Sequence, residues 1–103
     1  MRPADRIFLD AAVAIDGLLK ERVLSQHGHL TASEVFGIYE RLAVTMAFNT
    51  IGIAMAVAST EEGARRAIDM FQTALPHRIS EGLDRAIAVG LEARAANPNL
   101  TSH

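Results

Sequence analysis

The sequence predicts an all-α protein, a small helical bundle of three to four helices with a long apolar central helix. Apolar residues recur at three- and four-residue steps along most of the chain, which is typical of amphipathic helices. Two segments begin with the residue pattern of a helix cap. No stretch shows the strict apolar–polar alternation of a half-buried strand. With 103 residues, we expect residues 1–103 to form a single helical domain.

The first helix is expected over residues 3–24. Pro3 suits the first turn of a helix, because the N–H that proline lacks would have no partner there. Polar residues fall mostly between the apolar ones, as in a helix that lies on a core. The apolar set is Ile7, Phe8, Ala11, Ala12, Ile15, Leu18, Leu19 and Val23. The residues from Ser25 to His29 break this pattern and predict a loop.

The second helix is expected to begin at Ala32. Thr31 and Glu34 have the spacing of a capping box, in which each side chain accepts a hydrogen bond from the other residue's backbone. Leu30 and Val35 occupy the two positions of a hydrophobic staple. No glycine–proline break follows for about 27 residues, so this is the long central helix.

The second half of the central helix carries no charge, because nineteen uncharged residues lie between Arg41 and Glu61. A helix that is apolar nearly all round must be covered nearly all round. The length alone would permit a membrane span. The alanine content, the interior Asn49, and the lack of an aromatic belt or a basic cluster argue against one. We therefore expect the other helices and a second copy of the chain to cover it.

The third helical segment follows Ser59, which stands three residues before Glu62 and predicts another cap. The helix is expected to reach about Leu75, where Pro76 predicts a break or a kink. After it, apolar residues continue at four-residue spacing, so one kinked helix and two separate helices both remain open. These residues are Ile79, Leu83, Ile87 and Leu91. We expect a frayed tail over about 97–103.

The uncharged run leads to a predicted homodimer interface over residues 42–58. The interface residues are Leu42, Met46, Ile51, Ile53, Met55 and Val57. Asn49 and Thr50 are the polar exceptions. In one reading, Asn49 is hydrogen-bonded within the bundle and sets its register. In the other, Asn49 and Thr50 form a polar pocket that contacts a ligand.

No catalytic residue, metal site or cofactor is predicted. The chain has no cysteine, which excludes thiol nucleophiles and thiolate ligands. His27 and His29 flank Gly28 and could chelate a metal, but no third ligand stands at a telling spacing. The isolated glycines form neither a phosphate-binding loop nor a dinucleotide fingerprint.

Charge and composition limit the kinds of partner that we expect the chain to bind. The formal charge is −2, so the chain has no basic surplus for nucleic acid. The N-terminus lacks the pattern of a signal peptide, which predicts a cytoplasmic protein, and nine arginines against one lysine suggest a bacterial source. We expect a non-catalytic interaction, adaptor or regulatory protein that pairs with itself and with an unidentified protein. The alternatives are a small all-α enzyme or ligand-binding protein, and then a membrane-active protein.

Overall fold

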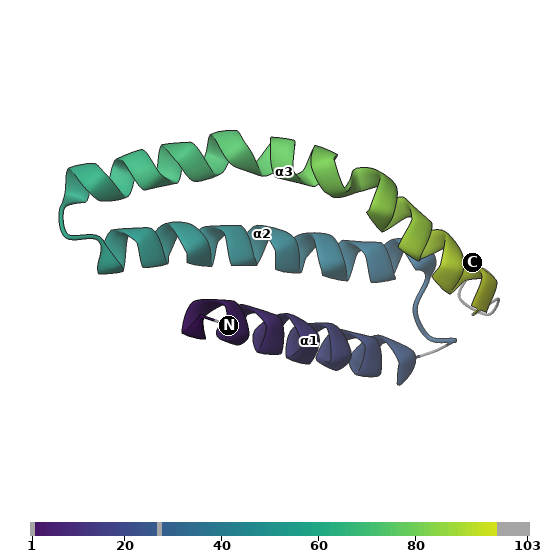
Figure 1. Ribbon diagram of the computed structural model, residues 1–103. Coiled ribbons are helices and arrows are strands. Elements are labelled where there is room, and N and C mark those ends of the chain that lie inside the picture. Colours follow the sequence, from purple (N-terminus) through teal and green to yellow (C-terminus); the bar gives the residue numbers. More distant parts are fainter. Residues whose placement is uncertain (1, 27, 97–103) are drawn as a thin grey trace.

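The computed structural model describes residues 2–26 and 28–96. They form three helices, α1 (Pro3–Leu24), α2 (Ala32–Val57) and α3 (Glu61–Ala96), and no strand occurs among them (Figure 1). The predicted all-α class is confirmed. The first helix has the predicted bounds and the second begins at the predicted residue. The third is a single helix that runs through Pro76, which decides between the two alternatives. The predicted frayed tail lies outside the described residues.

Hydroxyl side chains cap the second and third helices. At α2, the Glu34 amide donates to Thr31 Oγ1 at 3.1 Å, and the Thr31 amide donates to Glu34 Oε1 at 3.0 Å. This is the predicted capping box. At α3, the Gly63 amide donates to Thr60 Oγ1 at 3.0 Å. The prediction of Ser59 as the cap was therefore wrong by one residue, because the next hydroxyl reaches the amide of the third helical residue.

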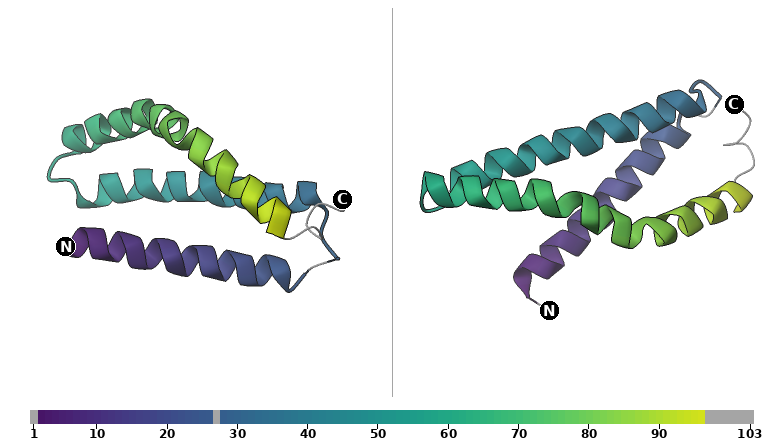
Figure 2. Two further views of the ribbon diagram at one scale, coloured as in Figure 1. Left: turned by 45° about the vertical axis from the view of Figure 1, so that its right-hand side comes forward. Right: turned by 90° about the horizontal axis from the view of Figure 1, so that it is seen from above.

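Pro76 lies in the middle of α3, where the helix bends (Figures 1 and 2). A proline inside a helix lacks the N–H that would bond to the carbonyl four residues earlier, and its ring clashes with that carbonyl. α2 and the first half of α3 lie side by side at their connecting turn, and α3 changes direction at the bend (Figure 2). The bend therefore divides one helix into two differently placed halves.

The three helices make an elongated and open arrangement. α2 and α3 form an antiparallel hairpin, and α1 lies on the other side of α2 and crosses it obliquely (Figures 1 and 2). The principal extents are 50 × 27 × 25 Å. The radius of gyration is 16.9 Å, whereas a compact domain of this length has about 13 Å. A single chain therefore does not close into a globule.

Packing is concentrated where α2 and α3 meet near their connecting turn. Ala64 is buried there, and it is the one buried residue among those described. The second half of α2 and the first half of α3 also contain half-buried residues. They are Ala47, Ile51 and Ala54 of α2, and Gly63, Ile68, Phe71, Ala74 and Leu75 of α3. A smaller half-buried group, Leu19, Val23, Leu30, Val35 and Ile38, lies where α1 ends and α2 begins. These two places are the protein's packed regions.

Candidate functional site

The most prominent functional feature is exposed apolar surface. Twenty-two large apolar side chains are exposed in the described part of the chain. The chain exposes 8728 Å² in total, whereas a compact monomer of its mass exposes about 5,700 Å². The excess is about 3,000 Å², and the exposed large apolar side chains of the described residues lie on all three helices.

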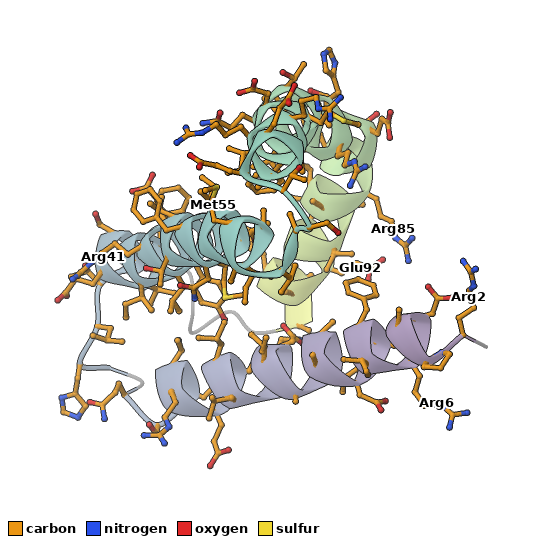
Figure 3. All side chains as sticks on the ribbon, turned by 90° about the vertical axis from the view of Figure 1, so that its left-hand side faces the viewer. Arg2, Arg6, Arg41, Met55, Arg85 and Glu92 are labelled. Atoms are coloured by element: carbon orange, nitrogen blue, oxygen red, sulfur yellow. The ribbon has the colours of Figure 1, made fainter. Side chains whose placement is uncertain are left out.

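α2 contributes the surface that the sequence singled out as an interface. Five of the six predicted interface residues are exposed: Leu42, Met46, Ile53, Met55 and Val57. Ile51 is half-buried instead, on the part of α2 that packs near α3. Leu42, Met46 and Ile53 fall within about 40° around the helix at 100° per residue, so they share one face. Figure 3 shows the Arg41 and Met55 side chains on α2.

Asn49 and Thr50 lie on α2 and form hydrogen bonds only within that helix in the described part of the chain. Thr50 Oγ1 donates to the Met46 carbonyl at 2.8 Å. Asn49 Nδ2 lies 4.0 Å from Met46 Sδ, a long contact with a weak acceptor. Both residues are exposed, so most of the hydrogen-bonding capacity of the Asn49 amide is turned to the surroundings. Whether that capacity serves a subunit contact or a ligand stays a prediction.

The second half of α3 is a further apolar surface, which the predicted interface did not include. We call Pro76–Ala96 the α3 arm, and every residue in it is exposed. Its large apolar side chains are Ile79, Leu83, Ile87, Val89 and Leu91. The four-residue spacing in the sequence was the signal that a helix face is present here. What the spacing could not show is that this face stays exposed among the described residues.

α1 presents a third apolar surface over its first five turns. Ile7, Phe8 and Leu18 are 69%, 67% and 51% exposed. The ionic contact on this helix is local, because Lys20 Nζ lies 2.9 Å from Asp16 Oδ2 one turn earlier. The hydrogen bond to Asp16 raises the pKa of Lys20 above its ordinary value. α1 is thus solvated along one side and apolar, but largely uncovered, along the other.

The charged side chains form no visible reaction centre. Among residues 2–26 and 28–96, no three histidine or carboxylate side chains lie close enough to hold a metal ion. His27, one half of the considered histidine pair, lies outside those residues. The ion pairs found in the described chain, Asp16–Lys20 and Glu61–Arg65, are exposed contacts one helical turn apart. Such pairs adjust helix stability and supply no catalytic geometry.

α2 is also long and apolar enough to cross a membrane, judged by its length and composition. The most apolar part of α2 is not buried inside the structure.

Comparison of the chain with protein-family models, with curated proteins and with solved structures finds no significant match. The exposed apolar helix faces are therefore the feature of the described chain that indicates a function.

Proposed function

We propose that this chain is a non-catalytic interaction protein that works as a homo-oligomeric helical bundle. One observation carries the proposal: a chain of 11.1 kDa exposes 8728 Å², about 3,000 Å² more than a compact monomer would. Helices whose apolar sides face water gain little from folding, because burial of that surface is the main favourable contribution to stability. Association supplies the missing burial.

The size of the excess favours an extensive, permanent association over a transient one. A standard protein interface buries about 800 Å² on each partner, and obligate dimers bury more, in more apolar interfaces. The excess per chain is several times the standard value. The exposed residues of α2, such as Met46 and Ile53, would form part of the interface. The predicted homodimer is the simplest arrangement of this kind.

A role in binding rather than catalysis follows from the type of residue at this surface. Its exposed members are Leu, Ile, Val, Met and Phe side chains, with single polar residues such as Asn49 between them. Apolar helix faces recognise other apolar helix faces, as in adaptor and regulatory bundles. Helix faces left over after self-association would receive an unidentified protein partner.

A membrane-active role is the second candidate, and the length and composition of α2 favour it. The charged residues Glu34, Glu40 and Arg41 oppose insertion of the first half of α2, because a charge in the hydrocarbon layer is costly. The uncharged part of α2 that remains, residues 42–57, is shorter than the about 20 residues that a full span needs. Partition of the purified chain into lipid vesicles would support this candidate.

Sedimentation velocity in the absence of detergent tests the proposal. We expect a stable dimer or a larger defined oligomer at micromolar concentration, with the far-ultraviolet circular dichroism of a helical protein. A well-folded monomer of 11.1 kDa under these conditions would contradict the proposal. Strong binding of that monomer to vesicles would transfer the assignment to the membrane-active candidate.

A further inference from the structure

The α3 arm has little packing support from the described part of its own chain. All twenty-one residues from Pro76 to Ala96 are exposed. Most helical stability in proteins comes from packing of an apolar face, so a helix that lacks such packing is only weakly stabilised. Gly82 and Gly90 each lower the stability of the arm further, by about 1 kcal/mol relative to alanine. A stably helical arm therefore needs a surface to pack against.

The arm has two chemically distinct sides. Ile79 follows the half-buried Leu75 by four residues, so the apolar side of the arm continues the side of α3 that packs near α2. Arg85 and Glu92 point away from α2 in Figure 3. The side that carries Arg85 and Glu92 is thus directed outward, and the side that carries Ile79, Leu83 and Ile87 is directed toward the region between the arm and α2. Arg94 lies on this second side, at the end of the arm. A partner of the arm must be apolar and must approach from that region.

We infer that this partner is the same arm of a second copy, an inference that rests on the oligomeric function proposed above. The excess exposed area of about 3,000 Å² is larger than a contact of standard size through α2 would remove, at about 800 Å² per partner. Pairing of the α3 arms covers an additional helix face in each copy. Because the surface is identical in both copies, a two-fold axis lets each arm cover the other.

The charges of the arm agree with an identical partner. The arm carries three arginines and three acidic residues, so its formal charge is zero. They are Arg78, Arg85 and Arg94, and Glu81, Asp84 and Glu92. Two such arms meet without net repulsion, whereas a strongly charged partner would gain no net attraction from this surface. The small formal charge of the whole chain, −2, likewise permits close approach of two copies.

Two neighbouring substitutions test the inference in the full-length chain. Ile87→Asp places a charge on the apolar side of the arm, and Arg85→Asp places the same side chain on the outward side. We expect Ile87→Asp to raise the dissociation constant of the dimer about 100-fold, because a buried charge would be unpaired. Arg85→Asp, which changes the net charge more, should leave it within about threefold. Sedimentation equilibrium measures both values, and equal effects of the two variants would overturn the inference.

A cross-linking experiment covers the case in which Ile87→Asp does not fold. The chain has no cysteine, so single cysteines at position 87 or 85 report on one place each. Oxidation should yield a covalent dimer for Ile87→Cys and little for Arg85→Cys. Equal yields from both would contradict the arm-to-arm contact.

The oligomeric function and the arm contact can fail separately. If Met46→Asp on α2 dissociates the oligomer and Ile87→Asp does not, the arm inference is wrong and the oligomeric function stands. If the unmodified chain is a monomer in solution, both are wrong. Binding of that monomer to phosphatidylcholine vesicles would assign the apolar side of the arm to a lipid surface instead.

Discussion

The two halves of α3 carry similar sequences but lie in different environments. In the first half, Ile68, Phe71 and Leu75 are half-buried, and they share a helix face with the fully buried Ala64. In the second half, Ile79 and Leu83 continue the same spacing and are 59% and 49% exposed. The two halves meet at Pro76, where the helix changes direction (Figure 2). An apolar pattern therefore predicts a helix face that is stabilised by burial. The path of the backbone decides whether other residues of the same chain bury that face.

Removal of the bend should have the largest effect on this difference. Pro76→Ala restores a backbone hydrogen bond and relieves a clash, which is worth up to about 3 kcal/mol in a helix interior. We expect a straighter α3, a higher free energy of unfolding and weaker self-association, because the arm would point in a different direction. Small-angle scattering, urea unfolding at fixed protein concentration and sedimentation measure the three quantities. Unchanged scattering would show that Pro76 does not cause the bend.

Truncation of two phenylalanines should show the difference in stability between a packed position and an exposed one. Phe71→Ala removes a half-buried ring from the α2–α3 contact and should lower the free energy of unfolding by about 2 kcal/mol. Phe36 of α2 is 68% exposed, so Phe36→Ala should change it by less than about 0.5 kcal/mol. Urea unfolding at one protein concentration compares them. A cost at Phe36 equal to that at Phe71 would place Phe36 in an interface as well packed as the hairpin.

The cap of α2 should contribute less than these packing contacts. Thr31→Ala removes the hydroxyl that accepts from the Glu34 amide, and we expect a loss of about 1 kcal/mol. Thr45→Ala is the control, since its hydroxyl donates to the Arg41 carbonyl inside the helix at 2.9 Å and helix interiors favour alanine. Thermal and urea unfolding should rank Thr31→Ala as the less stable variant. The reverse order would mean that the capping box does not hold the start of α2.

The smallest expected effect is a pH dependence at the same cap. Hydrogen bonds from Thr31, chiefly from its backbone amide, hold the pKa of Glu34 below its ordinary value of 4.5. The folded state therefore binds that proton more weakly than the unfolded state. The contribution is complete above pH 4.5 and is lost as the pH falls through the lowered folded pKa. The stability difference between the unmodified chain and Glu34→Gln should shrink over that range. A difference that grows on acidification would contradict this sign.

Local signals in the sequence predicted most of the fold. Thr31 and Glu34 located the start of α2, and Pro3 located the start of α1, because capping depends on neighbouring residues. The cap of α3 was misplaced by one residue, since Ser59 and Thr60 both carry a hydroxyl and the backbone path decides which one reaches the amide. Pro76 predicted either a kink or a break, because the backbone path after a proline also depends on more than the local sequence.

The surface that needs a partner was only partly predictable. The lack of charge after Arg41 identified α2 as a surface in excess. The α3 arm was not identified, because its charged side makes it resemble an ordinary helix that covers a core. Ile51 was assigned to the subunit interface, yet it is half-buried within the chain. Periodicity gives the faces of a helix, whereas the occupant of each face depends on the tertiary arrangement.

Concentration-dependent hydrogen exchange tests the central claim most directly, because it compares the two halves of α3 in one unmodified protein. Amides of residues 61–75 should be protected at all concentrations at which the hairpin is folded. Amides of residues 77–96 should be protected in the assembled protein and should lose that protection as dilution separates the copies. Rapid exchange throughout the arm at high concentration, with the hairpin still protected, would contradict the claim that a second copy covers the arm.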